Sequence, residues 1–381
     1  MSELIQKNDQ RAAARTGLLS TVSAIALAAY TASFDPALAE DANRPTVWIE
    51  MGGQLEMIQG TSRPFTAPFM FLTPTPGPYQ EDSLIDTQRP SPHAFGLEGK
   101  VSFQPENSDW IFSAGVRYGR SHTRRHVHHQ TAVPPTHWTV FGYPYTKYFD
   151  DQKLADTRLL SNESHTVLDF QAGKDIGIGI FGHGGTSTVS AGLRMAEFSA
   201  NTTTHIFARP SVNAAHATLF GFPWRAESFY QYTLSGEARR SFRGMGPSVS
   251  WTASADLIGG EHAHLDVDWG VDLSFLFGRQ KAQVDHSTAA YYLTGHHARG
   301  YQAYIRPYPT RTNHSNRSRS VVVPNVGGFA GISMKYPNAK ASLGYRADFF
   351  FGAMDTGIDT RHSQTVGFHG PFATISVGLG G

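Results

Sequence analysis

The chain of 381 residues contains no cysteine. This absence excludes disulfide bonds, thiolate metal sites and cysteine nucleophiles. Charge is also scarce: charged residues make up 17% of the chain, and 32 Lys plus Arg stand against 31 Asp plus Glu, a formal net charge of +1. Such a balance gives no overall field that attracts nucleic acid, so we expect no nucleic-acid partner. Aromatic residues reach 12%, which favours an ordered chain over a disordered one.

Long apolar runs are missing outside the N-terminal segment. There, Lys7, Arg11 and Arg15 precede the mostly apolar GLLSTVSAIALAAYTAS, and Ala-Leu-Ala at 37–39 offers a cleavage site of small residues. This pattern predicts a signal peptide over residues 1–39 and a mature chain of residues 40–381, with an N-terminal membrane anchor as the alternative. Because no later segment approaches the ~20 apolar residues of a spanning helix, the mature chain can cross a membrane only as a closed barrel.

Residues 265–278, LDVDWGVDLSFLFG, alternate between apolar and polar at almost every step. The odd positions are apolar, the even positions are mostly Asp, Ser and Gly, and Leu276 alone breaks the pattern. Successive side chains of a strand point to opposite faces of its sheet, so this period predicts a strand with one apolar and one polar face.

Similar alternation predicts ten strands in all. They lie at about 46–57, 93–104, 110–119, 165–174, 188–197, 248–257, 265–278, 327–336, 341–352 and 372–380. Their connections alternate between long polar segments and short turns, as in outer-membrane barrels with short periplasmic turns and long external loops. The long connections are residues 59–92, 120–163, 199–246, 279–320 and 354–367.

The predicted fold is therefore all-β, an antiparallel transmembrane β-barrel of about ten strands. Residues 228–238 also alternate; we place them in the third external loop, and counting them with a further strand would give twelve. A soluble β-sandwich is the competing fold, since its strands alternate too. Aromatic residues near the strand ends and small residues on the polar faces favour the barrel. The apolar faces are then expected to contact lipid in the outer membrane of a Gram-negative bacterium.

The whole pattern, from the signal through the amphipathic strands to the final GFHGPFATISVGLGG, resembles the Legionella-type major outer membrane protein family of porin-like barrels. The resemblance implies an outer-membrane location and passage of small solutes. The chain departs from such barrels at its end, because Leu379, Gly380 and Gly381 stand where an aromatic residue commonly does.

The polar faces of the predicted strands carry the candidate pore-lining residues. They are Glu50, Glu98, Lys100, Arg117, Asp169, Arg194, Asp256, Asp266, Asp268, Asp272, Arg346 and Asp348. Carboxylates outnumber basic groups, which predicts a weakly cation-preferring channel for small polar solutes or ions. The alternative is that these charges pair with one another and plug a narrow lumen. Association into a homo-oligomer is left open.

Histidine is abundant, at 18 residues, and the predicted loops contain SHTRRHVHH (121–129) and the pair His296–His297. Neighbouring imidazoles suit transition metals, but no ligand spacing recurs, so we predict no metal and no cofactor. Two acid–base sets, Ser164 with His165 and Asp169 and Asp256 with His262 and His264, lie in no nucleophile motif. We therefore expect no enzyme. The alternatives to a channel are a surface adhesin or recognition barrel and, second, an outer-membrane barrel enzyme.

Overall fold

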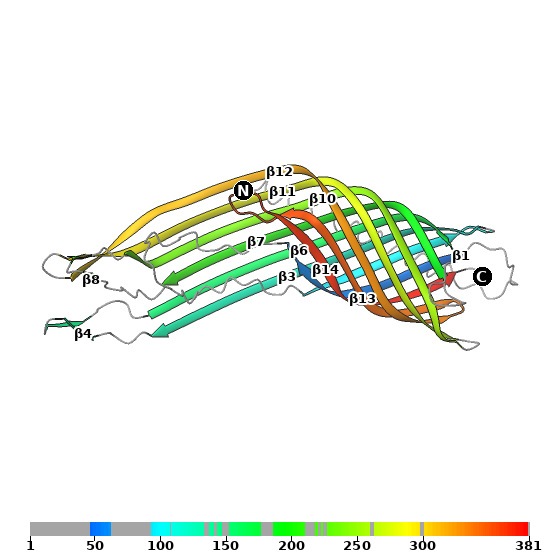
Figure 1. Cartoon of the computed structure of the whole chain (residues 1–381), viewed down its shortest axis with the longest axis horizontal. Coiled ribbons are helices and arrows are strands. Elements are labelled where there is room, and N and C mark those ends of the chain that lie inside the picture. The colour runs from blue at the N-terminus through cyan, green and yellow to red at the C-terminus, as the bar shows by residue number, and fades with distance from the viewer. Residues whose placement is uncertain are drawn as a thin grey trace, which may run out of the picture.

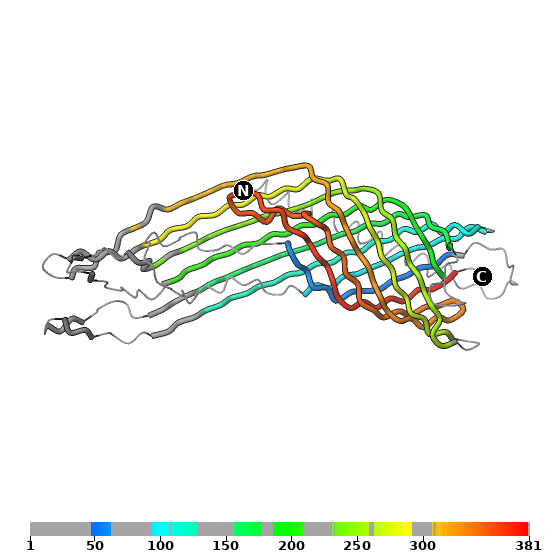
Figure 2. Tube along the Cα trace, in the orientation of Figure 1, coloured from blue at the N-terminus to red at the C-terminus, as the bar shows by residue number. Residues whose placement is uncertain are grey.

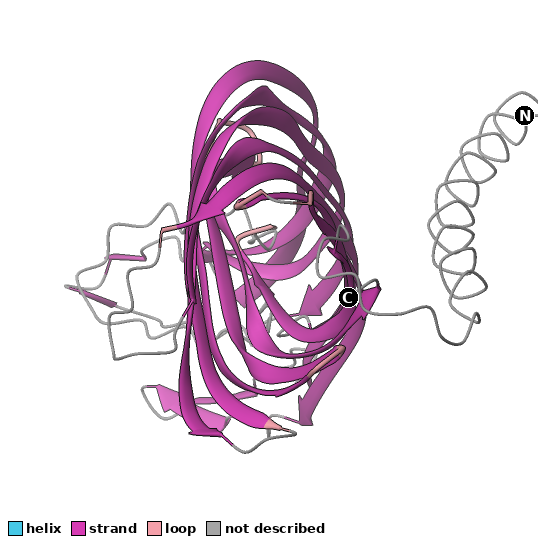
Figure 3. Ribbon diagram, turned by 90° about the vertical axis from the view of Figure 1, so that its right-hand side faces the viewer, coloured by secondary structure: helices cyan, strands magenta, loops and turns pink. Residues whose placement is uncertain are grey.

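The computed structural model of the chain describes residues 46–61, 93–106, 108–132, 137–140, 143–146, 152–176, 186–209, 218–219, 222–223, 227–259, 263–297 and 301–379. Every regular element in these ranges is a β-strand, and Figure 3 shows the strands curving around a common axis. No helix in these ranges is long and apolar enough to cross a membrane. The predicted signal peptide, residues 1–39, lies outside them.

Ten strands form one closed antiparallel barrel, in the order β1-β14-β13-β12-β11-β10-β7-β6-β3-β2 (Figure 1). Their bounds are β1 Thr46–Gln59, β2 His93–Gln104, β3 Trp110–Ala132, β6 Gln152–Asp175, β7 Thr186–Arg209, β10 Glu227–Gly259, β11 His264–His297, β12 Tyr301–Tyr336, β13 Ala339–Asp355 and β14 Ser363–Leu379. Two short hairpins lie outside the barrel: β4 His137–Val140 with β5 Tyr143–Thr146, and β8 Thr218–Leu219 with β9 Phe222–Pro223. The predicted all-β barrel of ten strands is confirmed.

The barrel wall is uneven in height. Strands β1, β2, β13 and β14 have 12–17 residues, whereas β3, β6, β7, β10, β11 and β12 have 23–36. Strand β2 pairs with β3 only as far as Arg120, and β13 pairs with β12 only from Asn325. Beyond these points the six long strands continue together as an open sheet (Figure 1). We call this part the external sheet: residues 120–132, 152–165, 197–209, 227–244, 278–297 and 301–324.

The external sheet corrects the predicted loops. Much of 120–163, 199–246 and 279–320 is strand, and residues 228–238 are the first part of β10 rather than a loop. The sense of the alternation is reversed there, with apolar side chains inside and polar side chains outside. On β10, Leu234 and Ala238 are buried inside the curved sheet, while the exposed positions between and beyond them are polar, such as Ser235 and Arg239. A search for large apolar residues on the outer face therefore misses these strands.

We call the closed part of the wall, between the external sheet and the short turns, the lower barrel. Its outer face is apolar, as the phase of residues 265–278 predicts. Val271 and Phe277 are 46% and 58% exposed, whereas Asp266 and Asp268 point inward and are buried. Leu276, the one fault in the alternation, points into the barrel and is fully buried. Exposed aromatic side chains lie toward both ends of this apolar band, among them Phe95, Phe275, Phe277 and Phe351 toward the external sheet and Trp110, Phe112 and Tyr336 toward the short turns.

Candidate functional site

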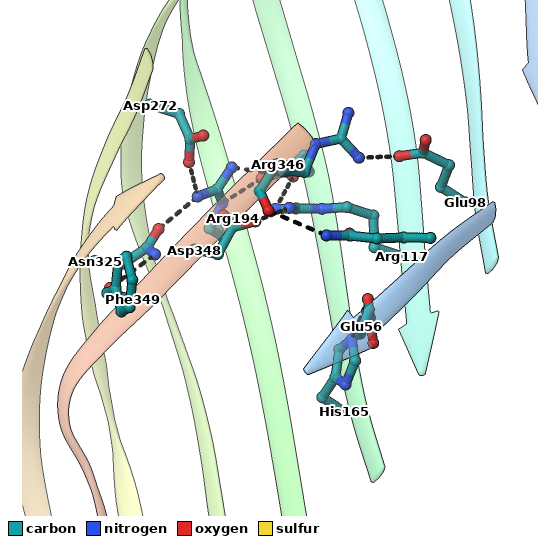
Figure 4. A network of polar contacts seen from close by, with 12 residues as sticks. Glu56, Glu98, Arg117, His165, Arg194, Asp272, Asn325, Arg346, Asp348 and Phe349 are labelled. Carbon is teal, nitrogen blue, oxygen red and sulfur yellow. Dashed lines mark hydrogen bonds and ion pairs between the residues drawn. The ribbon is translucent and has the colours of Figure 1, made fainter. Parts of the chain in front are cut away.

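A layer of ion pairs crosses the interior of the barrel (Figure 4), and Arg194 of β7 is its best-connected member. The Arg194 Nε donates to Asp169 Oδ1 of the neighbouring strand β6 at 2.6 Å. Its Nη1 donates to Asp272 of β11 and to Asn325 Oδ1 of β12, the latter at 2.5 Å. Arg194 is 3% exposed, so this guanidinium joins four strands from within the lumen.

Two further arginines span the lumen itself. Arg117 Nη1 of β3 donates to Asp348 Oδ2 of β13 at 2.5 Å, although β2, β1 and β14 separate these strands in the wall. Arg346, also on β13, donates to Glu98 of β2 across β14 and β1. Buried carboxylates are stabilised only when they are paired and hydrogen-bonded in this way. The layer therefore ties opposite walls of the barrel together.

Glycine makes room for the crowded carboxylates. A Cβ at Gly327 of β12 would lie 2.4 Å from Asp348 Oδ1 and 2.5 Å from Asp272 Oδ2. Any larger residue would push these two acids away from their arginines. Gly327 thus leaves the space that the ion-pair layer needs.

An apolar layer fills the barrel next to the ion pairs, on the side of the external sheet. Its centre is Phe198, whose ring lies 4.7 Å from Phe350, 5.4 Å from Phe368 and 5.6 Å from Phe242, centroid to centroid. Nine of the ten strands contribute buried apolar side chains to this layer. These side chains are Ile58, Ala94, Val167, Ala196, Phe198, Ala200, Phe242, Leu276, Val323, Phe350, Ala353, Met354, Val366 and Phe368. The tenth, β3, contributes the buried Gly119 and Ser121. All ten strands thus contribute buried residues at this level, and we call this layer the aromatic plug.

A buried acid–base pair lies at the edge of the aromatic plug. His165 Nε2 of β6 is 3.4 Å from Glu56 Oε1 of β1, with both side chains at most 5% exposed. The imidazole also packs on the Phe368 ring, 3.9 Å between centroids. Ser164 lies on the opposite face of β6, and Asp169 is held by Arg194, so the structure does not assemble the set of Ser164, His165 and Asp169.

On the other side of the ion pairs, toward the short turns, the lumen holds a cavity of about 310 Å³. Nine of the twelve predicted pore-lining residues line it: Glu50, Glu98, Lys100, Arg117, Asp169, Arg194, Asp268, Asp272 and Arg346. Of the other three, Asp348 is buried in the ion-pair layer, Asp266 is 2% exposed, and Asp256 is exposed near the end of β10. Asp268 is paired with Lys340 Nζ of β13 at 2.7 Å, a partner that was not among the predicted residues.

The connection between β13 and β14 folds onto the external sheet. Arg317 of β12 donates to Asp355 Oδ2 at 2.9 Å and to the carbonyl oxygen of Gly357 at 2.8 Å. Asp359 accepts from Asn313 Nδ2 at 2.5 Å and lies 2.7 Å from His286 Nε2. These contacts hold residues 356–362 against the external sheet. No sequence motif predicts these contacts.

Three histidines of SHTRRHVHH, namely His122, His126 and His128, lie on one face of a single strand. All three side chains are exposed on the outer face of β3. His126 Nε2 lies 2.8 Å from Asp156 Oδ1, and His128 Nδ1 is 4.0 Å from Asp156 Oδ2. Over the part of the chain that the structure describes, no group of three or more His, Cys, Asp or Glu is placed to hold a metal ion.

No family model matches the sequence, and no curated protein matches it. Among solved structures, the outer membrane protease OmpT from Escherichia coli is similar at 9% identity, with 90% of this chain and 99% of that chain covered and a TM-score of 0.33. The toluene transporter TodX of Pseudomonas putida is similar at 11% identity, with 89% and 90% covered and a TM-score of 0.19. The strand pairing itself defines the class, a closed ten-stranded antiparallel β-barrel. Nothing in these comparisons supports the Legionella-type family in particular, so that resemblance stays a prediction.

Proposed function

We propose that the protein spans the outer membrane of a Gram-negative bacterium, is closed across its lumen, and recognises ligands at the cell surface through the external sheet. The membrane placement is supported by the outer face of the lower barrel, where Val249, Val271 and Leu273 are each about half exposed to the surroundings. Exposed apolar residues on every second position outside and charges inside are the arrangement of a transmembrane barrel.

The observation that carries the proposal of a closed surface protein is the aromatic plug. All ten strands contribute buried residues at that level, and Phe198, Phe242 and Phe350 are at most 1% exposed. Conduction needs a continuous wet path, which a packed apolar layer interrupts. The large structure that remains available to other molecules is the external sheet.

The charge of the external sheet indicates the kind of ligand. Its two open edges are residues 120–129 of β3 and 306–319 of β12, and neither segment contains an acid. The first holds three Arg and four His, and the second holds four Arg and one His. Three of these groups already have acidic partners on neighbouring segments, namely Arg317 with Asp355, His126 with Asp156 and His314 with Asp285, and the other arginines carry the excess positive charge. Charged edges also discourage pairing with other sheets. Charge complementarity favours an acidic ligand.

Sidedness is tested first. The chain has no cysteine, so single substitutions Asn316→Cys on β12 and Asn338→Cys in the β12–β13 turn give unique labelling sites. A membrane-impermeant maleimide should label Asn316→Cys on intact cells, and Asn338→Cys only after the outer membrane is permeabilised. Labelling of Asn338→Cys on intact cells contradicts the proposed orientation.

Ligand charge is tested with heparin as an acidic probe. Folded protein in detergent should bind immobilised heparin and elute with salt, and the variant Arg124→Gln/Arg319→Gln should elute earlier because two exposed edge charges are lost. Arg158→Gln is the matched control, since Arg158 is exposed but lies 3.5 Å from Asp156. Equal elution of all three proteins would remove the support for an acidic ligand.

A channel is the second candidate, and the charged cavity toward the short turns favours it. In planar bilayers the closed barrel should show little conductance, and Phe242→Ala/Phe350→Ala should raise it by opening the aromatic plug. A cation-selective conductance from wild type, lowered by Asp266→Asn/Asp268→Asn/Asp272→Asn, would instead establish the channel.

A further inference from the structure

A cluster of basic side chains lies on the outer face where the apolar band ends. Met245 of β10 and Phe277 of β11 are register partners and are 51% and 58% exposed. Two residues further toward the external sheet, on the same face, the partners are Arg243 and Arg279, both exposed. One further step along β11 brings the exposed Lys281. The outer surface thus changes from apolar to basic within one repeat of the strand.

The pairing of Arg243 with Arg279 is unfavourable on its own. Like charges directly opposite each other on neighbouring strands repel and destabilise the sheet. On the other side of Arg243, its register partner on β7 is Glu197, which balances one of the three cations. A net positive charge remains, so an anion placed between the two strands would relieve the repulsion.

The geometry of Arg279 suits a phosphate. Its Nε donates to Ser318 Oγ of β12 at 2.6 Å, and this bond orients the guanidinium of an exposed side chain. A guanidinium offers paired donors that match the oxygens of a phosphate group, better than the single ammonium of lysine does. Lys281 adds a third positive charge beside them.

We propose that Arg243, Arg279 and Lys281 bind a phosphate group of a glycolipid in the outer leaflet, with its acyl chains against Met245 and Phe277. The inference rests on the membrane placement proposed above. Met245 and Phe277 lie next to the arginines on the outer face. They favour a lipid over free phosphate, because a lipid places its phosphate at the arginines and its acyl chains on these two apolar side chains. Basic side chains next to an apolar membrane face gain their attraction from headgroup charge in this way.

The test uses the full barrel, folded in detergent, with lipid A as the probe. Native mass spectrometry compares binding of bis-phosphorylated and dephosphorylated lipid A to wild type, to Arg243→Gln/Arg279→Gln and to Arg239→Gln. Wild type should prefer the phosphorylated form, and the double variant should lose about thirtyfold in affinity, since each of the two basic residues near the surface adds about 1 kcal/mol. Arg239→Gln is the control, because that arginine lies further from the band and is ion-paired with Glu237 at 2.6 Å.

Several results would overturn the inference. They are equal binding of the two lipids by wild type, undiminished binding by the double variant, or full displacement of the lipid by inorganic phosphate. Heat-modifiable migration on gels reports folding of each variant. Arg243→Lys/Arg279→Lys, which keeps the charge, should retain part of the affinity if the double glutamine variant fails to fold. A wild type absent from the outer-membrane fraction refutes the membrane placement, whereas a membrane-inserted wild type without lipid preference refutes this inference alone.

Discussion

Strand β10 runs through both the barrel and the external sheet, and the two parts have opposite polarity. In the barrel part, Met245 and Val249 point outward and are each 51% exposed, while Ser248 points inward and is buried. In the external part, Leu234 and Ala238 are buried inside and Arg239 is exposed outside. Figure 2 shows the backbone passing from one part to the other without interruption.

The same two-residue alternation therefore places apolar side chains outside in the barrel part and inside in the external sheet. A strand only decides that neighbouring residues face opposite ways; the medium on each side decides which residues are apolar. The change falls between Phe242 and Met245 on β10, and at Leu276 and Phe277 on β11, where successive apolar residues point to opposite faces. The outer face meets water above this level and, we propose, lipid below it.

Breaking the ion-pair layer should have the largest effect on the barrel part. Arg194→Met leaves the carboxylates of Asp169 and Asp272 without their shared partner inside the lumen. We expect a loss of about 3–5 kcal/mol in unfolding free energy, the usual cost of removing one member of a buried pair. Urea unfolding in lipid vesicles measures it. Asp272→Asn is the control, because it keeps an acceptor oxygen and leaves Asp169 to balance Arg194; an equal loss in both variants would contradict the role given to Arg194.

Truncation of the aromatic plug tests the apolar interior. Phe350→Ala removes a fully buried ring that packs against Phe198, and about 3–5 kcal/mol should be lost, toward the lower end if water enters the space. The same unfolding experiment applies. Phe351→Ala, next in sequence but 46% exposed on the outer face, is the matched control and should cost less. If Phe351→Ala costs more than Phe350→Ala, the inward and outward assignments are wrong.

An arginine on the outer face separates the two environments. Val271→Arg should cost about 2–4 kcal/mol if the residue faces the middle of a bilayer. Ser235→Arg, on the outer face of the external sheet and opposite Ser287 of β11, should change stability by less than about 0.5 kcal/mol, as an ordinary surface substitution does. Comparable costs for the two variants, measured in vesicles, would show that both positions meet the same medium.

The smallest expected effect is that of acid on the β13–β14 connection, whose local stability should fall at low pH. The hydrogen bond from His286 to Asp359 holds the pKa of that carboxyl below its ordinary value of 3.8. A carboxyl whose folded pKa is lowered stabilises the fold above the ordinary pKa, and that stability is lost as pH falls through the folded value. Hydrogen exchange of residues 356–362 should therefore accelerate, after correction for the intrinsic rate, as pH is lowered below about 4. Asp359→Asn should weaken this dependence and leave the part that Asp355 contributes, because the pKa of Asp355 is also lowered. An unchanged profile would show that Asp359 does not anchor the connection.

Much of the barrel could be predicted from the sequence because alternation is a local signal. The number of strands and the inward side of residues 265–278 follow from it. The external sheet is harder to predict because its outer face is polar, so its alternation resembles that of a hydrophilic loop. Its inward face uses small residues such as Ala238 and Ala282, which give little contrast.

The candidate site could be predicted only as a set of inward charges. Which charges pair depends on distances across the lumen, as between Arg117 and Asp348, and no sequence spacing encodes them. The aromatic plug does leave a signal in the sequence. Leu276 and Phe350 are faults in otherwise regular alternation, and both point into the plug. An apolar residue on the polar face of a barrel strand therefore marks a place where the lumen is filled.

The pairing of β1 with β14 differs from the other pairings in the barrel wall, which all join strands consecutive among the ten. The consecutive pairs can form as hairpins while the chain is being delivered, at low cost in chain entropy, whereas β1 and β14 meet only after everything between them is in place. Figure 2 shows this seam on the short side of the wall, away from the long strands of the external sheet. Until β1 and β14 pair, the barrel is a curved sheet with two unpaired edge strands. The pairing of β1 with β14 is therefore expected to form last and to close the barrel at its short side.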